Sequence, residues 1–191
     1  YVRDPELVIN FYNERRKQLL DVEPNAGHTG LAELEKDFNV TVVTQNVDNL
    51  HERAGSTHVI HLHGELTKVC SSRDPYNPRY VRELKPEEYE VKMGDKAGDG
   101  SQLRPFIVWF GEAVPEIETA IGYVEKADIF VIIGTSMNVY PAAGLLNYVP
   151  RTAEVYLIDP KPVDTHTSRS IHVIQKGASE GVAELKKKLL L

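Results

Sequence analysis

The densest group of potential ligand-binding side chains follows a short apolar strand. The run TVV (41–43) is rich in β-branched residues, as is typical of a buried strand. The next eight residues, TQNVDNLH (44–51), offer hydroxyl, amide, carboxylate and imidazole groups. A turn from a strand to a helix needs only a capping residue and a glycine. This surplus predicts that Gln45, Asn46 and Asp48 bind a polar ligand.

The other predicted strands also end in polar or glycine residues. These residues are His63 with Gly64, Gly111 with Glu112, the segment GTSMN (134–138), and Asp159. In parallel α/β sheets, ligands bind beyond the carboxyl ends of the strands. Each residue alone is also an ordinary helix cap or turn residue. Their convergence at successive strand ends nevertheless favours a single binding edge.

Two histidines raise the alternative of a metal site. His61 and His63 lie two residues apart, so in a strand their imidazoles would project from the same face. Asp48 would add a carboxylate, as in a metal-dependent hydrolase. No further histidine or carboxylate has a ligand-like spacing, and His61 would equally pack between sheet and helix. We therefore predict no metal ligands.

Alternating strands and helices must position these groups. The apolar runs predict strands at 39–44, 58–62, 104–110, 128–134, 154–158 and 171–174. Helical spacing predicts helices at 5–20, 29–38 (capped by Thr29), 48–54, after Pro115, at 141–148 and at 178–190. The alternation predicts an α/β fold, a Rossmann-like parallel sheet with helices on both faces. Residues 65–103 are rich in prolines, charges and glycines, so we expect a Rossmann-like domain of 1–64 and 104–191 carrying a small, loop-rich inserted module.

Composition excludes several classes of protein. The 191 residues are 41% hydrophobic and 26% charged, which is typical of one globular domain or of one domain with an insert. The formal net charge of −6 argues against direct nucleic-acid binding and is compatible with a cationic peptide partner. No stretch approaches the ~18 apolar residues of a membrane span. The single cysteine, Cys70, excludes an intrachain disulfide and suits the reducing cytoplasm.

The chain resembles the sirtuins, the NAD-dependent protein lysine deacylases. The matching stretches are PNAGH (24–28), TQNVDNLH (44–51), HLHGEL (61–66), LRPFIVWFGE (103–112), GTSMNVYPAAG (134–144) and IDPKP (158–162). They occur in the family's order, span almost the whole chain and form a specific combination. The helix NFYNERR (10–16) looks most like the prokaryotic and mitochondrial branch. The resemblance implies an acylated-lysine protein or peptide as partner, with the acyl group transferred to ADP-ribose and nicotinamide released.

The resemblance also implies a role for each matching position. Asn46 and Asp48 would line the nicotinamide pocket, and Gln45 would contact the adjoining ribose. His63 would be the general base acting on a ribose hydroxyl, a role that suits an imidazole near neutral pH. The remaining roles would be an acyl-lysine channel of Val108, Trp109 and Phe110, a strand edge of Gly111 and Glu112 that pairs with substrate backbone, and an adenosine site of Gly134, Thr135, Ser136, Val139 and Asp159.

Three features depart from the family pattern. The family's inserted module commonly holds zinc on two CxxC pairs, whereas Cys70 alone cannot hold a tetrahedral zinc, so we expect none. Asp159 stands where asparagine is usual, although a carboxylate can still accept from ribose hydroxyls. The glycine-rich phosphate turn is not found in the sequence and would lie upstream of Tyr1. We therefore expect this chain to be a fragment that neither binds NAD tightly nor turns over by itself.

Other functions remain open at this point. An NAD- or ADP-ribose-binding module without catalysis is motivated by the missing zinc ligands and by Asp159. A metal-dependent hydrolase would use His61 and His63. A sirtuin-like ADP-ribosyl transferase would be a variant of the deacylase, because it breaks the same bond.

Overall fold

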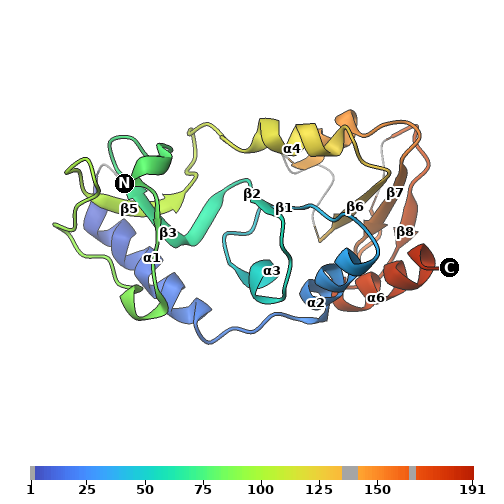
Figure 1. Cartoon of the computed structure of the whole chain (residues 1–191), viewed down its shortest axis with the longest axis horizontal. Coiled ribbons are helices and arrows are strands. Elements are labelled where there is room, and N and C mark those ends of the chain that lie inside the picture. Colours follow the sequence, from blue (N-terminus) through green and yellow to red (C-terminus); the bar gives the residue numbers. More distant parts are fainter. Residues whose placement is uncertain (1–2, 135–141, 164–166) are drawn as a thin grey trace. The chain divides into compact units, whose positions relative to one another are not determined.

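The computed structural model of the protein describes residues 3–134, 142–163 and 167–191, and the chain divides into two compact units (Figure 1). Unit 1 comprises Tyr1–Glu23, Thr44–Asn49 and His61–Pro115. Unit 2 comprises Pro24–Val43, Leu50–Ile60 and Glu116–Leu191. Each unit is therefore built from three separate stretches of chain.

The core of unit 2 is a three-stranded parallel sheet. Its strands are β6 (Ile129–Ile133), β7 (Glu154–Ile158) and β8 (His172–Ile174), in the order β6-β7-β8. The register pairs Ile133 with Ile158 and Ile158 with Ile174, so the strands end at one edge. A parallel sheet is thus confirmed for three of the six predicted strands, and their aliphatic runs explain why it forms.

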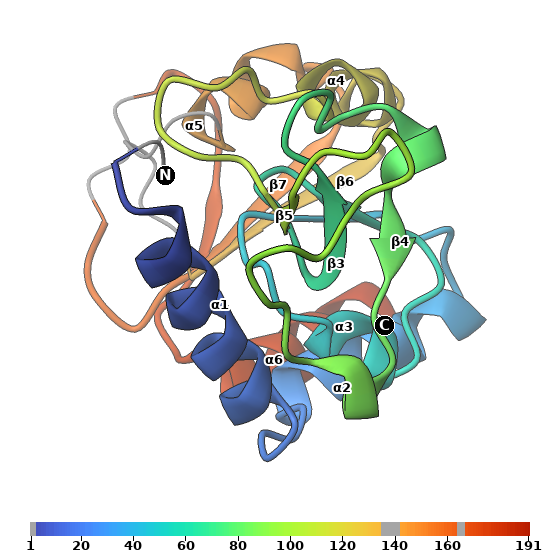
Figure 2. The same ribbon diagram turned by 90° about the vertical axis from the view of Figure 1, so that its left-hand side faces the viewer.

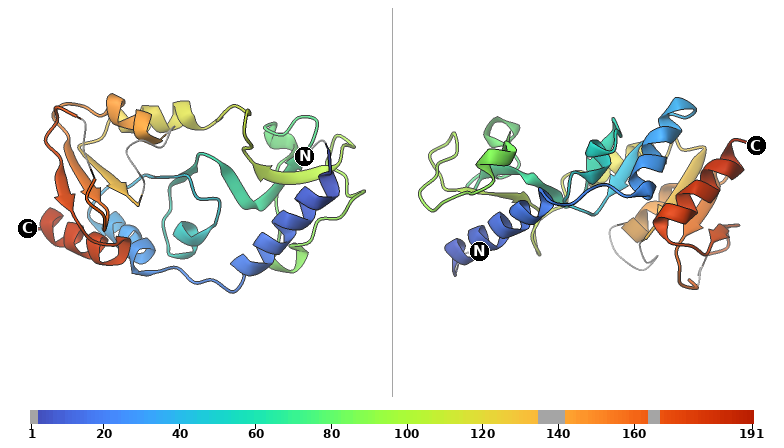
Figure 3. Two further views of the ribbon diagram at one scale, coloured as in Figure 1. Left: turned by 180° about the vertical axis from the view of Figure 1, so that it is seen from behind. Right: turned by 90° about the horizontal axis from the view of Figure 1, so that it is seen from below.

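Helices cover this sheet on both sides. Helix α6 (Ala178–Leu189) lies against β7 and β8, and α2 (Ala26–Glu33) packs on α6. Helices α4 (Ile117–Val124) and α5 (Ala142–Leu145) lie on the opposite side (Figures 1 and 3). The core between α6 and the sheet consists of Leu34, Ile158, Ile174, Val182 and Leu185. The arrangement confirms the predicted α/β class.

Helix α2 begins earlier than the sequence suggested. Asn25 Oδ1 accepts the His28 N–H at 3.0 Å, and His28 Nδ1 accepts the Asn25 N–H at 3.1 Å. This reciprocal capping box starts the helix at Ala26, so the expected cap at Thr29 is wrong. PNAGH is therefore a helix start rather than a turn, because both orphan N–H groups are already satisfied there.

Unit 1 joins a helix to an antiparallel sheet (Figure 2). Helix α1 (Pro5–Leu19) begins after Asp4, whose Oδ1 accepts the Leu7 N–H at 3.0 Å, as expected for an N-cap. The sheet has the order β4-β3-β5, with β3 (Gly64–Ser71), β4 (Arg82–Glu83) and β5 (Leu103–Ile107). Helix α1 contacts β3 and β5, and the buried apolar cluster consists of Ile9, Val69, Leu84, Val91, Ala97 and Leu103.

The units have other boundaries than the predicted division at residues 64 and 103. Strand β5 pairs antiparallel with β3, so residues 103–107 pack with the insertion rather than with the parallel sheet. The predicted strand at 104–110 also ends at Ile107. An inserted module of 65–103 that acts as a separate body remains a prediction.

Two buried polar residues fasten α1 to the inserted segment. The Asn13 side chain donates to the Val91 carbonyl at 2.7 Å and accepts the Val91 N–H at 2.9 Å. Arg16 Nε donates to the Leu66 carbonyl at 2.7 Å, and Nη1 donates to the Tyr89 carbonyl at 2.6 Å. Burial lowers the pKa of Arg16 to about 10, which still leaves the guanidinium charged at neutral pH.

The remaining elements are short. Strand β1 (Val42–Thr44) pairs with β2 (Val59–His61), and α3 (Leu50–Arg53) lies between them in the chain. The 3₁₀ turns are η1 (Leu34–Lys36), η2 (Pro78–Tyr80), η3 (Pro86–Glu88) and η4 (Leu146–Tyr148). Among the described residues, no helix combines the length and the apolar character needed to cross a lipid bilayer.

Candidate functional site

The polar loop after β1 is held against the segment that leads from β2 into β3. Three hydrogen bonds, all within unit 1, make this attachment. Leu62 N–H donates to the Thr44 carbonyl at 3.0 Å, His61 Nδ1–H to the Asn46 carbonyl at 3.1 Å, and Leu66 N–H to the Val47 carbonyl at 2.7 Å. The loop carrying Gln45, Asn46 and Asp48 is therefore fixed beside the turn that carries His63.

Within this loop, structural and exposed side chains separate clearly. Thr44 is buried, and its Oγ1 accepts the Asn46 N–H at 3.0 Å, so Thr44 shapes the turn. The Asn46 side chain is exposed, and Asp48 is half-buried. The Asn49 Oδ1 atom is buried and accepts no hydrogen bond from the described part of the chain. A buried acceptor of this kind fits a donor brought by a ligand.

His63 lies in the turn between β2 and β3 and is half-buried. Its carbonyl accepts the Val108 N–H at 2.8 Å. Gly64 follows with φ +91°, and a Cβ there would run into the Phe106 carbonyl oxygen. Position 64 therefore requires glycine both for its backbone conformation and for the close approach of β5. This requirement fixes where His63 stands.

The geometry removes the reason for a metal site on His61 and His63. Strand β2 ends at His61 and the chain turns at Leu62 and His63, so the two imidazoles do not share a strand face. His61 is buried, with Nδ1 on the Asn46 carbonyl and Nε2 3.8 Å from Glu65. His61 is thus a buried packing residue that also hydrogen-bonds to the 44–49 loop. This agrees with the alternative to metal binding given for it from the sequence.

The segment predicted to line an acyl-lysine channel forms a tight turn after β5. The Glu112 N–H donates to the Trp109 carbonyl at 3.0 Å, and Gly111 has φ +83°, which suits the third position of a type II turn. Phe110, at the second position, is fully exposed. Residues 109–112 are therefore a turn rather than a continuation of β5, and the pairing of Gly111 and Glu112 with substrate backbone stays a prediction.

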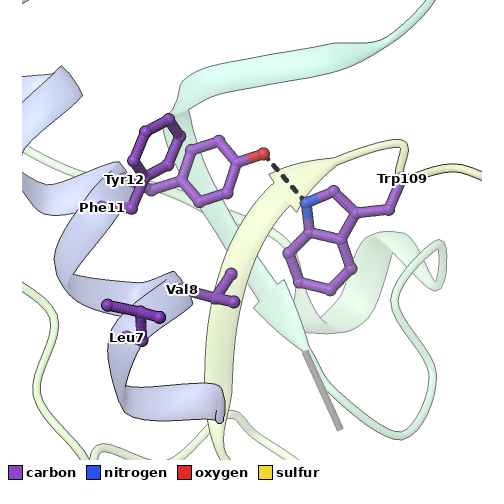
Figure 4. A pocket seen from close by; sticks show the side chains of 5 residues that line it. All are labelled: Leu7, Val8, Phe11, Tyr12 and Trp109. Atoms are coloured by element: carbon purple, nitrogen blue, oxygen red, sulfur yellow. Dashed lines mark hydrogen bonds between the residues drawn. The ribbon is translucent and has the colours of Figure 1, made fainter. Parts of the chain in front are cut away.

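Trp109 joins this turn to helix α1. Its Nε1–H donates to the Tyr12 hydroxyl at 3.1 Å (Figure 4). An apolar groove of about 460 Å³ lies here, lined by Leu7, Val8, Phe11, Tyr12 and Trp109. Sequence reasoning missed Tyr12 and also missed Arg104, which pairs with Glu112 at 3.0 Å. In the sequence these residues stand in the short runs FYN (11–13) and RP (104–105), and neither run specifies a contact.

In unit 2, two of the predicted adenosine-site residues lie at the carboxyl edge of the parallel sheet. Gly134 follows β6 and has φ +62°, and its N–H donates to the Ile158 carbonyl at 3.2 Å. Asp159 follows β7, and its Oδ1 accepts the Lys161 N–H at 2.8 Å. Thr135, Ser136 and Val139 lie outside the described residues.

The residues of the insertion do not fit a thiolate zinc site. Cys70 is buried in β3 with Sγ 3.8 Å from the Pro105 carbonyl, and burial raises its pKa to about 11, so it stays a neutral thiol. The adjacent Ser71 hydroxyl donates to Asp99 at 2.5 Å and lies 2.9 Å from the Ser101 hydroxyl. Hydrogen bonds therefore make the cross-connection between β3 and the segment that precedes β5.

Comparison with known proteins places this geometry in a family. The Sir2 family profile matches residues 1–141. A Bacteroides thetaiotaomicron protein named NAD-dependent protein deacylase is 85% identical over 190 residues, which cover 100% of this chain and 81% of that protein. A Helicobacter pylori protein of the same name is 48% identical over 98% of this chain and 80% of its own length.

Solved structures agree with the sequence matches. A Sir2 homologue in complex with NAD has a TM-score of 0.82 at 35% identity, over 99% of this chain and 75% of that chain. Sir2Tm bound to a propionylated peptide has a TM-score of 0.78 at 28% identity, over 98% of this chain and 80% of that chain. The resemblance found in the sequence is confirmed: the chain belongs to the Sir2 family.

Proposed function

We propose that His63 is the general base of an NAD-dependent protein lysine deacylase, and that Gln45, Asn46 and Asp48 hold the nicotinamide end of NAD. The deacylase function and the NAD cofactor are supported by family membership and by the names of the relatives. The observation that carries the residue roles is the attachment of the 44–49 loop to the His63 turn. Three hydrogen bonds hold the two segments together within one unit.

The donor set in unit 1 fits the nicotinamide and its ribose. Amide and carboxylate side chains at Asn46 and Asp48 can meet both the donor and the acceptor of a carboxamide. The buried Asn49 Oδ1, which accepts nothing within the described residues, adds an acceptor beside them. When bound, NAD supplies the ADP-ribose that receives the acyl group, and nicotinamide leaves.

The His63 imidazole is suited to take a proton from a hydroxyl. Its half-buried position keeps one side open to a ligand, and Gly64 fixes its backbone. The carbonyl of the same residue holds Val108, the first residue proposed to line the acyl-lysine channel. Trp109 and Phe110 continue that lining, and their apolar rings exclude water from the acyl group. We also propose that Gly111 and Glu112 pair with the substrate backbone.

For the adenosine half we propose Gly134, Thr135, Ser136, Val139 and Asp159. Support comes from Gly134 and Asp159, which stand where parallel strands β6 and β7 end. Asp159 already accepts one backbone N–H, and its second oxygen can accept from a ribose hydroxyl. No zinc is proposed, because Cys70 is buried and protonated at neutral pH.

The proposed partner is a protein or peptide that carries an acylated lysine. The peptide complex of Sir2Tm supports this assignment, and the net charge of −6 suits a cationic segment around the modified lysine. Direct binding to nucleic acid or to a membrane is not proposed. The single cysteine keeps the reducing cytoplasm as the proposed compartment.

Nicotinamide release tests the proposal. The full-length protein is incubated with NAD and with acetylated, succinylated or unmodified peptides, and both nicotinamide and free lysine are quantified. We expect release that requires both NAD and the acyl group, and a fall in kcat of about 10²–10⁴-fold in His63→Ala with little change in melting temperature. Deacylation that persists without NAD would indicate a hydrolase. NAD binding with no turnover would indicate a binding module.

A further inference from the structure

Arg104 is a buried charge beside the proposed acyl-lysine channel. It lies in β5 and is only 4% exposed. Its guanidinium donates to Glu112 Oε2 from Nη1 at 3.0 Å, to Glu112 Oε1 from Nη2 at 3.1 Å, to the Ile107 carbonyl from Nη2 at 2.6 Å, and to the Pro105 carbonyl from Nε at 3.2 Å. The group is thus almost saturated by partners at both ends of the 104–112 segment.

The face of the same guanidinium holds the Trp109 ring. Arg104 Cζ lies 3.8 Å from the ring centroid, well within the ~6 Å range of a cation–π contact. Glu112 Oε1 in turn accepts the Trp109 backbone N–H at 2.8 Å. Arg104 therefore contacts the Trp109 ring, while Glu112 accepts a hydrogen bond from the Trp109 backbone.

Stability alone is a weak reason for this arrangement. Arg104 is buried and Glu112 is half-buried, and an ion pair withdrawn from water rarely stabilises a fold more than apolar residues of similar size, because desolvation offsets the attraction. What the planar fork of arginine adds is geometry, since it can bind a carboxylate through two parallel hydrogen bonds while an aromatic ring stacks on it. Lysine offers a point charge and cannot do both.

We propose that Arg104 is a positioning residue for the acyl-lysine substrate. It holds Trp109 and the Trp109–Glu112 turn so that the indole and the exposed Phe110 present a fixed wall to the acyl chain. The inference rests on the proposed function, because it assumes that the channel carries acyl-lysine. It adds a residue outside the channel that governs how well the substrate binds.

The test compares matched variants of the full-length protein. Arg104→Lys and Arg104→Met remove the fork, and Glu112→Gln weakens the other half of the pair while keeping its shape. Arg82→Met is the control, because Arg82 forms an exposed ion pair with Glu88 at 3.5 Å in the same unit. For each protein we measure KM for the acyl peptide, KM for NAD, kcat and tryptophan emission. Trp109 is the only tryptophan among the 191 residues, so its emission reports on the surroundings of this indole, which include Tyr12 as well as Arg104.

A positioning role predicts a split between the two substrates. We expect KM for the acyl peptide to rise about tenfold, equivalent to about 1.4 kcal/mol, while KM for NAD changes little. Trp109 emission should shift to the red in the Arg104 variants, and the addition of acyl peptide should restore it in part. Arg104→Lys should fall closer to Arg104→Met than to the unaltered protein.

Other outcomes overturn the inference. A variant that merely loses folded molecules would lower kcat with both KM values unchanged, and that result rejects the positioning role. Unchanged emission in Arg104→Met also rejects it. If Arg104→Met does not fold, Glu112→Gln must give the same KM split. Failure of the unaltered protein to release nicotinamide rejects the proposed function instead, and the emission shift still tests the Arg104–Trp109 contact.

Discussion

The carbonyl of His63 accepts the backbone N–H of Val108 at 2.8 Å. One backbone hydrogen bond thus joins the proposed general base to the first residue of the proposed acyl-lysine channel. Neither side chain takes part, so the only substitution at either position that removes the bond directly is proline at 108, which lacks the N–H. The neighbouring Gly64 is the position at which this junction can be disturbed.

Gly64→Ala should lower both stability and activity. The new Cβ would collide with the Phe106 carbonyl oxygen, and position 64 has φ +91°, which is unfavourable for alanine. Gly94→Ala is the matched control, because Gly94 has φ +99° with open space around it, and it should cost only about 1 kcal/mol. Urea unfolding should show a clearly larger loss for Gly64→Ala. Equal losses at the two positions would mean that the contact with β5 is unimportant.

Asp48→Asn should weaken NAD binding without unfolding the protein. A hydrogen bond to a charged group contributes about 1.5–3 kcal/mol, so KM for NAD should rise on the order of 10- to 100-fold. Asp21→Asn, at an exposed position after α1, should leave KM unchanged. Steady-state kinetics of nicotinamide release at varied NAD provide the measurement. A normal KM for NAD in Asp48→Asn would remove Asp48 from the pocket.

The Cys70 thiol should be inert in the folded protein. Burial raises its pKa to about 11, so the thiol stays protonated at pH 8, and the side chain has no solvent access. A disulfide reagent such as DTNB should react slowly with the native protein. In guanidinium chloride it should titrate the chain's one thiol quickly. Fast labelling under native conditions would show that β3 opens readily.

The hydrogen bonds to Asp99 should make the stability of the inserted segment sensitive to acid. Because no zinc is expected there, chelators should not affect it. Hydrogen bonds from Ser101 and Ser71 lower the pKa of Asp99 to about 2. Because the folded-state pKa lies below the unfolded value of ~3.8, this stabilisation is present above pH 4 and is lost as the pH falls through 4 toward 2. Asp99→Asn should be less stable at pH 7 and should lose less between pH 5 and pH 2.

Asp37→Asn, at an exposed position, is the control for that comparison and should follow the unaltered protein. EDTA should not change the melting temperature of any of these proteins. Stoichiometric zinc in the purified protein, or destabilisation by EDTA, would contradict the hydrogen-bonded connection.

Asn13→Ala should destabilise unit 1 through three lost hydrogen bonds. It would leave the N–H and the carbonyl of Val91 without their side-chain partner, and it would remove the acceptor that Arg16 Nη1 meets at 2.7 Å. The expected loss is roughly 2–4 kcal/mol in the free energy of unfolding. Asn10→Ala, exposed on the same helix, should change that free energy by less than about 0.5 kcal/mol. Similar losses for both variants would show that water replaces Asn13.

The sequence predicted best where one strong local pattern acted. Aliphatic runs specified the parallel strands β6 and β7, and the polar surplus after β1 marked the loop that the structure places beside His63. Periodicity could not reveal the partner of β5. Pairing of residues 103–107 with β3 is a long-range choice that no local pattern encodes.

Contacts between side chains distant in the sequence were the other feature that the sequence did not predict. Arginine in a strand has many uses, and only the fold brings Glu112 and Trp109 onto Arg104. The start of α2 was missed because Asn25 and Thr29 are both good caps, and the reciprocal bond from His28 decided between them. The Trp109–Glu112 turn was missed because Phe110 continues the apolar run of β5, and such a run is equally compatible with a longer strand.

The chain passes between its two units five times, at 23/24, 43/44, 49/50, 60/61 and 115/116. No single cut or recombination event can therefore separate the two units, because each is built from three separate stretches of chain. Within unit 1, Asp48 comes from one stretch, His63 and Trp109 come together from a second, and Tyr12, which accepts a hydrogen bond from Trp109, comes from the third. Homologous exchange of any one of these stretches would combine its residues with unmatched residues of the other two, so chimaeras of related chains should lose function at junctions within unit 1 before they lose their fold.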